Sequence, residues 1–297
     1  MTAAPRLLID IGNTRLKWAW CPGDGSGGGP AAPWTAAGAL PHDRIGELPQ
    51  RLVEAAGGRI AAMPETWASN VAGPGVAARL DEVLASAFAL PSGAAPVVHW
   101  ARSEPAHDLL DNGYREPARL GVDRWIGSIG ARALHPQGDL MIVTAGTATT
   151  IDIVSAPRLT HGRSRFEGGL ILPGLALMMG SLARNTAQLP ELEMAEIARL
   201  AGSADRGGTQ SRKPAAWADN TRDAIAAGCL SAQVGAVERI WREVSARGPA
   251  RCLLSGGARE VLGAAMPVPF ELHENLVLLG LAVLAGAFVP AQDAPPR

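Results

Sequence analysis

The feature that most constrains the fold is a strand–turn–strand pattern that occurs twice in the chain. The first copy spans residues 7–20 and turns at Gly12-Asn13, and the second spans residues 140–154 and turns at Gly146-Thr147. An apolar run that reverses at glycine and a small polar residue predicts a β-hairpin. The copies share few identical residues but start about half a chain length apart, which predicts two similar halves.

Helical and strand patterns alternate in both halves, so the sequence predicts an α/β protein of layered strands and helices. At about 150 residues per domain, the 297 residues suggest two domains, residues 1–137 and 138–297. Helices are expected at residues 44–56, 76–88, 123–134, 174–187, 220–247 (with Asn220 as N-cap), after 257 and at 276–289. Short strands are expected at 67–71, 97–100 and 251–254, and glycine-rich turns or loops at 23–33, 168–174 and 202–214.

Composition excludes several classes of protein. With 27 basic and 28 acidic side chains, the net charge of −1 lacks the basic excess of a nucleic-acid binder. The longest apolar run, residues 276–289, is too short to span a bilayer, so no membrane partner is expected. The three cysteines are far apart and the six histidines show no metal-ligand spacing, which predicts a cytoplasmic protein without a structural zinc.

The two hairpin turns have residue types that suit phosphate. Glycine lets the backbone approach a ligand, and backbone N–H groups with a threonine or asparagine side chain supply donors. Asp10 ends the first strand beside its turn, where a carboxylate would repel bare phosphate but could hold Mg²⁺ or a metal-bound water. Each turn alone is also compatible with an ordinary hairpin, and Lys17 with a solvated strand residue, but both turns together favour a nucleotide cleft.

Asp123-Arg124 stands where a helix is expected to begin. An aspartate there is most often an N-cap, and the alternative is a general base that takes a proton from an attacking hydroxyl. Arg124 could bind a carboxylate or phosphate through two N–H groups. Ser255-Gly256-Gly257 follows a strand and could bind an anion or simply connect two elements. A GxGxxG pattern at Gly23 precedes Gly-Pro-Ala-Ala-Pro, which cannot form the helix of a dinucleotide site.

Taken together, the motifs resemble the type III pantothenate kinases, a family also described as Bvg accessory factor-like. Six motifs occur in the family's order between residue 7 and about residue 260. They are Asp10-x-Gly12-Asn13-Thr14-x-x-Lys17, the run from Tyr114 through Pro117 and Gly121 to Asp123-Arg124, Gly146-Thr147-Ala148-Thr149-Thr150-x-Asp152, Gly168-Gly169-x-x-x-Pro173-Gly174, Asn185-Thr186-Ala187-Gln188-Leu189-Pro190 and Asn220-Thr221-x-x-Ala224-Ile225-x-x-Gly228.

The resemblance implies duplicated α/β domains of the acetate and sugar kinase/Hsp70/actin type around a nucleotide cleft. It implies ATP-dependent phosphorylation of the 4′-hydroxyl of pantothenate, with Asp123 as general base, Mg²⁺ near Asp10 and a homodimer in which Thr221 reaches across the interface. The residues that it assigns to pantothenate are Tyr114, Gly121, Val122, Asp123, Arg124 and Thr221. Those that it assigns to ATP are Asp10, Ile11, Gly12, Asn13, Thr14, Arg15, Leu16, Lys17, Gly146, Thr147, Thr149, Gly256 and Gly257, with residues 168–174 and 256–257 nearer the adenosine.

One position departs from the family pattern. The second phosphate motif of these kinases opens with an aspartate that is associated with an activating monovalent cation, K⁺ or NH₄⁺, and this chain has Thr144 there. Threonine offers a hydroxyl and a carbonyl but no charge, so we predict weak or absent activation by K⁺. The substitution also keeps open a second function, that of a non-catalytic nucleotide-binding accessory protein. A third possible function is that of another kinase or phosphatase of the same fold, which the run from Tyr114 to Arg124 disfavours.

Overall fold

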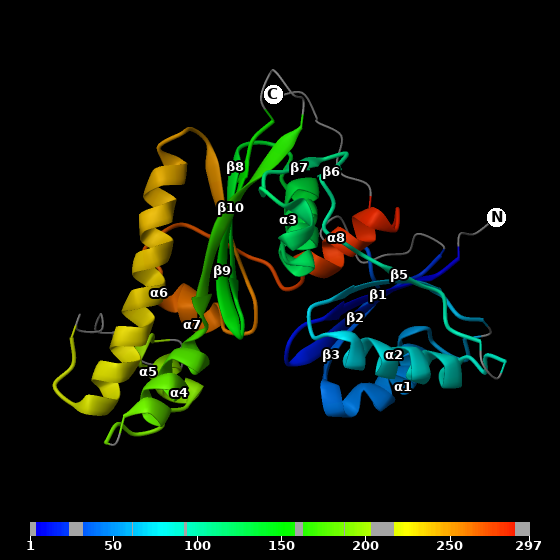
Figure 1. Cartoon of the computed structure of the whole chain (residues 1–297), viewed down its shortest axis with the longest axis horizontal. Coiled ribbons are helices and arrows are strands. Elements are labelled where there is room, and N and C mark those ends of the chain that lie inside the picture. The colour runs from blue at the N-terminus through cyan, green and yellow to red at the C-terminus, as the bar shows by residue number, and fades with distance from the viewer. Residues whose placement is uncertain are drawn as a thin grey trace. The chain divides into compact units, whose positions relative to one another are not determined.

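The computed structural model describes residues 4–23, 32–60, 62–91, 94–157, 163–186, 188–202 and 217–288. The chain forms two compact units (Figure 1). Unit 1 comprises Met1–Gln137, Pro157–Phe166 and Asn275–Arg297, and unit 2 comprises Gly138–Ala156 and Glu167–Glu274. Each unit has its own buried apolar cluster.

Unit 1 is built on a five-stranded sheet in the order β3-β2-β1-β4-β5, formed by β3 (Ala36–Pro41), β2 (Arg15–Cys21), β1 (Arg6–Ile11), β4 (Glu65–Asn70) and β5 (Val98–Trp100). β1 runs antiparallel to β2 and parallel to β4. Because side chains alternate along a strand, Leu7, Ile9 and Ile11 enter one core. Three helical segments cover this face of the sheet, η1 (His42–Glu47), α1 (Leu48–Ala55) and α2 (Pro74–Ala87).

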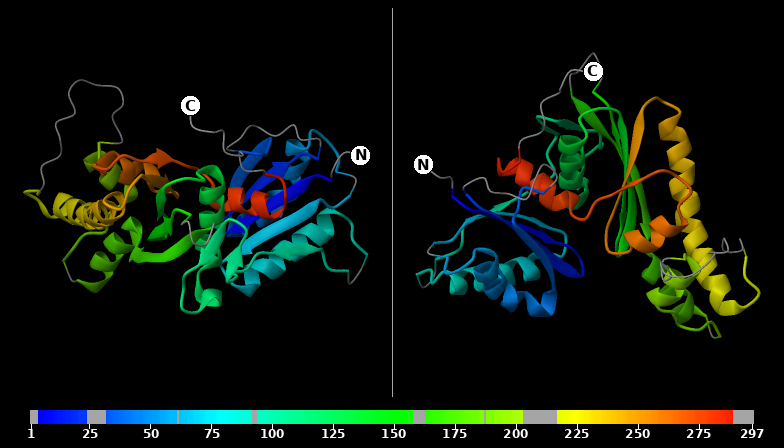
Figure 2. Two further views of the ribbon diagram at one scale, coloured as in Figure 1. Left: turned by 90° about the horizontal axis from the view of Figure 1, so that it is seen from above. Right: turned by 180° about the vertical axis from the view of Figure 1, so that it is seen from behind.

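The other side of unit 1 is held by two helices that pack closely together, α3 (Val122–Leu134) and α8 (Leu276–Leu284) (Figure 2). Glycine allows their close approach: a Cβ at Gly130 would overlap the Leu276 carbonyl oxygen, and one at Gly280 the Ile126 carbonyl oxygen. Helix α8 also contacts β1, β2 and β4. Short elements precede α3, namely β6 (Ala106–His107), β7 (Leu110–Asn112) and η2 (Pro117–Arg119).

Unit 2 repeats the strand order of unit 1. Its strands β8 (Asp139–Ala145), β9 (Ala148–Ser155), β10 (Ser164–Pro173), β11 (Ala250–Ser255) and β12 (Glu271–Leu272) lie in the order β12-β11-β8-β9-β10. The first residues of β10, Ser164 to Phe166, belong to unit 1 and pair with β7, so the sheet continues through β7 to β6. As with β1, strand β8 is antiparallel to the next strand and parallel to β11. The helices of this unit are α4 (Leu175–Asn185), α5 (Met194–Leu200), α6 (Thr221–Ser245) and α7 (Arg259–Ala265).

The matching topologies confirm the α/β class and the duplication that the two hairpins predict. In both units a hairpin is followed by a third strand, by helices, and by two parallel strands that join the sheet beside the first strand. Asn220 caps α6 as expected, since its side chain accepts a hydrogen bond from the Asp223 amide at 3.0 Å.

Three expectations about elements were wrong in part. Residues 168–174 are not a turn run, because β10 continues to Pro173. Gly168 adopts a φ of 142° inside this strand, a conformation that suits glycine, and the strand continues through it. Residues 44–56 begin as the 3₁₀ segment η1, and α8 ends at Leu284, before Gly286 with its φ of 63°.

The two loops expected near residues 23–33 and 202–214 lie mainly outside the described residues. Within the described residues, no helix is long and apolar enough to cross a membrane.

Candidate active site

The first hairpin turn exposes the polar residues of the first motif. Gly12 donates its N–H to the Arg15 carbonyl at 3.0 Å, which closes a tight loop between β1 and β2. Asn13, Thr14 and Arg15 are exposed at the tip, whereas the side chains of Ile11 and Leu16 are fully buried in the core. Ile11 and Leu16 can therefore offer only backbone groups to a ligand.

Asp10 is a buried carboxylate at the end of β1. One of its oxygens, Oδ1, accepts a hydrogen bond from the Ser69 hydroxyl at 2.9 Å, and the Lys17 ammonium lies 3.8 Å from the other, Oδ2. Burial raises the pKa of Asp10; Lys17 and the Ser69 hydrogen bond oppose this, and the carboxylate of Asp123 adds to it. A cation beside Asp10 would offset the cost of burying the charged carboxylate. Mg²⁺ is commonly held by one or two carboxylates together with phosphates and water, so the Asp10 carboxylate fits this ion.

The second hairpin turn also closes on a glycine N–H but is shorter than the first, because the glycine bonds to the carbonyl two residues on instead of three. Gly146 donates its N–H to the Ala148 carbonyl at 3.0 Å, and Gly146 and Thr147 are exposed. Thr149 is buried at the start of β9. Thr144 stands two residues before the glycine, the place that Asp10 has in the first hairpin, and pairs with Thr150.

Two other glycine turns of unit 2 approach this second hairpin turn. Gly174 donates its N–H to the Thr147 carbonyl at 3.0 Å, and a Cβ on Gly174 would overlap the Gly146 carbonyl oxygen. Gly256 has a φ of 98° and lies against the Ala145 carbonyl, while Gly257 is exposed. The folding of unit 2 thus brings together glycines from three distant motifs.

An arginine packed against two aromatic rings forms the second part of the site in unit 1. Arg124 is 8% exposed, and its Nη1 donates to the Tyr114 hydroxyl at 2.8 Å. The carbon at the centre of its guanidinium lies 5.7 Å from the ring centroids of both Tyr114 and Phe166. The rings meet edge to face at 5.8 Å. Such contacts hold a guanidinium in one orientation.

Asp123 lies in the first turn of α3, one residue before Arg124. The N-cap of the helix is Gly121, not Asp123, and the Asp123 carboxylate accepts the Arg124 N–H at 2.9 Å. A Cβ on Gly121 would lie 2.8 Å from Oδ1 of Asp123, so a side chain at 121 would displace the carboxylate. The capping interpretation is therefore wrong in its simple form, although the carboxylate does satisfy one N–H of the first turn.

Asn112, Phe166 and Ser69 support these groups, and sequence analysis did not find them. Asn112 is buried; its side chain donates to the Glu104 carbonyl at 3.0 Å and accepts from the Tyr114 amide at 3.0 Å. Phe166 is fully buried and Ser69 is buried under Asp10. No local pattern marks Phe166 and Ser69, because each acts through a partner that is distant in sequence. The bond from Asn112 to the amide two residues on is a local turn contact, which an asparagine followed by glycine could have signalled.

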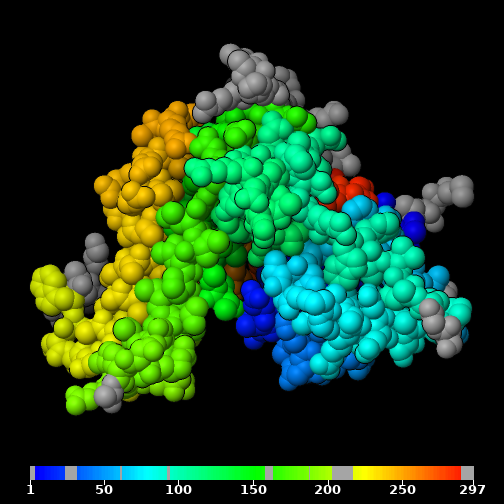
Figure 3. Space-filling model, viewed as in Figure 1, coloured from blue at the N-terminus to red at the C-terminus, as the bar shows by residue number. Residues whose placement is uncertain are grey.

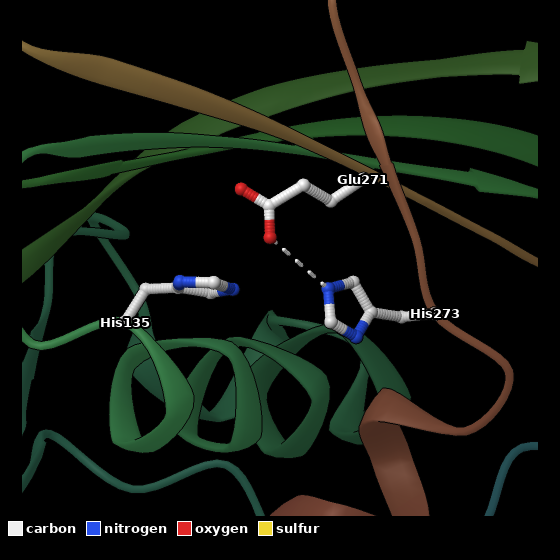
Figure 4. Close-up of side chains that lie close together, drawn as sticks. All are labelled: His135, Glu271 and His273. Atoms are coloured by element: carbon white, nitrogen blue, oxygen red, sulfur yellow. Dashed lines mark ion pairs between the residues drawn. The ribbon is translucent and has the colours of Figure 1, made fainter. Parts of the chain in front are cut away.

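A histidine and a glutamate lie close together at the far edge of the sheet of unit 2 (Figure 4). Nε2 of His273 is 4.0 Å from Oε2 of Glu271, and Nη1 of Arg251 donates to Glu271 at 2.6 Å. Burial lowers the pKa of His273, and Glu271 acts in the opposite direction. These residues belong to none of the phosphate or substrate motifs; His135, also drawn in Figure 4, belongs to unit 1.

Comparison with known proteins shows the family of this chain. The sequence profile described as type III pantothenate kinase matches residues 6–243. The chain belongs to the type III pantothenate kinase family. A type III pantothenate kinase from Cupriavidus taiwanensis is 55% identical over 298 residues, covering 96% of this chain and 99% of the relative. Another from Aromatoleum aromaticum is 40% identical, covering 94% and 97%.

A solved structure shares the fold at much lower sequence identity. A putative 2-dehydro-3-deoxygalactonokinase from Sinorhizobium meliloti has a TM-score of 0.51 and 15% identity, covering 95% of this chain and 98% of the other. The predicted actin-like kinase fold is confirmed. Membership of the family assigns to the chain an ATP-using pantothenate kinase activity, the first step of coenzyme A biosynthesis.

Proposed function

We propose that the chain transfers the γ-phosphoryl group of ATP to the 4′-hydroxyl of pantothenate, with Asp123 as general base and Arg124 as the anchor of the pantothenate carboxylate. The observation that carries this assignment is the position of Arg124, which directly follows Asp123 in α3 and is held by Tyr114 and Phe166. It presents a fixed cation and a carboxylate from consecutive residues, as a substrate with a carboxylate and a hydroxyl requires.

On the acceptor side, each residue has a distinct task. A guanidinium can form two parallel hydrogen bonds to a carboxylate, and its orientation here is already set by Tyr114 and Phe166. Gly121 leaves room for the Asp123 carboxylate, and Val122 and Gly121 offer backbone beside it. Thr221, exposed as the first residue of α6, supplies a hydroxyl from the partner subunit in this proposal.

Phosphoryl transfer needs alignment and charge neutralisation more than covalent catalysis. Asp123 would accept the proton of the attacking hydroxyl. Mg²⁺, when bound, neutralises charge on the phosphates, and Asp10 would hold it directly or through water. We assign to ATP the first turn in unit 1 (Gly12, Asn13, Thr14, Arg15 and Lys17, with the backbone of Ile11 and Leu16) and in unit 2 Gly146, Thr147, Thr149, Gly256 and Gly257.

Thr144 leads to a prediction about monovalent cations. Because it brings no charge to the second hairpin, we expect K⁺ and NH₄⁺ to raise the rate little compared with Na⁺ at constant ionic strength. A matched Thr144→Asp variant should gain K⁺ activation if this position governs the cation. A steep K⁺-specific rise in the rate of the parent protein would contradict the prediction.

The decisive experiment is ATP-dependent phosphorylation of pantothenate by the purified protein with Mg²⁺. Asp123→Asn should reduce kcat by about 10²- to 10⁴-fold while ATP binding persists, because it removes only the general base. Asp108→Asn, an exposed aspartate in the same unit, is the matched control and should keep full activity. A parent protein that binds ATP but shows no turnover with any cation would instead favour the accessory-protein alternative.

We also propose a homodimer whose interface includes α4 and the end of β10. Large apolar side chains of these elements are exposed: Leu170, Ile171, Leu177 and Leu182. Helix α4 lies on the surface of unit 2 that Figure 3 shows in yellow-green. Clustered apolar exposure of this kind is typical of protein–protein contacts.

Two broader assignments stay predictions. They are the division into domains at 137/138 and a cytoplasmic location, which the three buried free cysteines support.

A further inference from the structure

A cavity of about 210 Å³ in unit 1 is lined by residues other than those assigned above to pantothenate or ATP. Its apolar wall is made by three tryptophans together with aliphatic side chains of α3 and α8. The residues of this wall are Trp67, Trp100, Trp125, Ile126, Ile129 and Leu284. Trp125, Ile126 and Ile129 are almost completely buried, so they form the inner side of the cavity.

The size and lining of the cavity suit one aromatic ring. An apolar cavity of about 150 Å³ in another protein binds benzene, so 210 Å³ leaves room for a ring with a small substituent. Indole faces favour offset or edge-to-face contact with another ring. Trp67 already stacks on His99 at 4.6 Å and donates its indole N–H to Glu65 at 3.0 Å, which fixes its orientation.

Two donors at the cavity select the substituent. Arg102 lines the cavity and forms no ion pair with any of the residues that the structure describes. His107 also lines it, and its Nδ1 accepts the Leu109 N–H at 3.2 Å, which places the imidazole proton on Nε2. Burial lowers the pKa of His107, so the ring stays neutral and keeps this arrangement at neutral pH. A guanidinium with an imidazole N–H recognises a carboxylate; Glu104, also in the lining, disfavours a second negative charge.

One wall of the cavity is connected to the loop that carries the acceptor site. The Ser103 hydroxyl donates to the Leu120 carbonyl at 2.8 Å, next to Gly121. The Asn112 side chain donates to the Glu104 carbonyl and accepts from the Tyr114 amide. Trp125, on the inner wall, follows Arg124 in α3. A molecule in the cavity would therefore touch segments that position Tyr114 and Arg124.

We propose that this cavity binds a one-ring aromatic monocarboxylate, with the ring among Trp67, Trp100 and Trp125 and the carboxylate on Arg102 and His107. The ligand differs from pantothenate, which has no ring, and the site uses none of the residues assigned to pantothenate or ATP. The proposal does not depend on the kinase assignment.

The test uses benzoate as the probe with the full-length protein. Binding is followed by saturation-transfer NMR and by tryptophan fluorescence, and the neutral isostere benzamide serves as the ligand control. We expect saturable benzoate binding, benzamide binding at least about tenfold weaker, and a loss of about tenfold or more in Arg102→Gln, because a charge-assisted contact is removed. Ala106→Phe, a change at an exposed residue of the cavity lining, should abolish binding by filling the space.

Further controls separate this cavity from the pantothenate site. Pantothenate should not compete with benzoate, and Arg124→Gln should leave benzoate binding unchanged. Circular dichroism and thermal unfolding should show that Arg102→Gln and Ala106→Phe fold like the parent. The proposal is overturned if benzoate does not bind at millimolar concentrations, if pantothenate displaces it, or if folded Ala106→Phe binds it as the parent does.

Discussion

At the scale of single residues, the Asp10 carboxylate is proposed to hold Mg²⁺, but its burial destabilises the folded protein when it is charged. Burial raises its pKa, so the folded protein holds this proton more tightly than the unfolded chain does. The contribution of Asp10 to stability is therefore full below the ordinary aspartate pKa and is lost as the pH rises through the raised pKa. Above the raised pKa the buried carboxylate is charged, and Lys17 and the Ser69 hydrogen bond offset part of the cost.

We therefore predict that Asp10→Asn stabilises the fold at neutral pH while it reduces kinase activity. The gain in the free energy of unfolding should grow between about pH 4 and pH 7, measured by urea denaturation at a series of pH values. Asp108→Asn, at an exposed position, should show no such trend. A loss of stability in Asp10→Asn throughout this range would contradict the argument.

Tyr114 supplies the hydroxyl that accepts from Arg124, so Tyr114→Phe should loosen the guanidinium without removing the ring. A hydrogen bond to a charged group contributes about 1.5–3 kcal/mol. We predict a rise of about tenfold in KM for pantothenate, with little change in KM for ATP. Steady-state kinetics with each substrate varied in turn measures both values, and an equal rise in both would argue against this role.

The sequence motifs contain the residues proposed to bind the substrates, but they do not contain the residues that support those side chains. Asp10, Gly12 and Arg124 lie in short patterns whose chemistry can be stated from residue type and spacing. Phe166 acts through the Arg124 guanidinium, a contact between segments far apart in the sequence, and Asn112 also donates to the carbonyl of Glu104, eight residues away. Periodicity along one segment carries no information about such contacts.

At the scale of elements, the α3–α8 contact depends on two glycines. A Cβ at Gly130 would overlap the Leu276 carbonyl oxygen, which belongs to a helix backbone and cannot move aside easily. A Cβ at Gly127, one turn earlier in α3, would meet only Val277 Cγ2 at 3.7 Å, an ordinary contact.

We predict that Gly130→Ala lowers the free energy of unfolding by about 1–3 kcal/mol, the usual cost of overpacking. Gly127→Ala should be neutral or stabilising, because alanine favours the helix over glycine. Denaturant unfolding of the two variants gives the comparison. Equal effects would mean that helix propensity, not the contact with α8, dominates.

Strand β10 shows where local signals mislead. The glycines and proline of residues 168–174 suggested turns, yet β10 extends through them to Pro173. Sheet formation decided the outcome, because pairing with a neighbouring strand overrides weak local preference. By contrast, the long helix α6 was predicted nearly to its ends, since Asn220 and Gly248-Pro249 give strong boundary signals.

At the scale of the whole molecule, the internal repeat was the most informative feature of the sequence. It predicted two similar sheets, and the strand orders of the units agree with it element by element. It did not predict that α8, near the end of the chain, belongs to unit 1 beside β1 and α3. The sequence of an apolar helix does not indicate which sheet the helix will pack against.

The exposed apolar residues of β10 and α4 lead to a prediction about assembly. Ile171 is 64% exposed, so Ile171→Glu should not disturb the core of unit 2. It should shift the protein from dimer towards monomer by placing a charge in an apolar contact. Light scattering after size-exclusion chromatography measures this, with Val97→Glu as control, at an exposed valine of unit 1. A parent protein that is monomeric would contradict the proposed dimer.

The return of α8 to unit 1 has a consequence for synthesis on the ribosome. Strand β1 is made early, but its neighbour α8 follows only after all of unit 2 up to Glu274 has been added. Helix α3, most of whose residues are buried in the finished protein, therefore waits with an apolar face uncovered while unit 2 is made. Residues 138–156 and 167–274, which make up unit 2, are all added to the chain before α8 is made. The unit that begins the chain is the last to be completed.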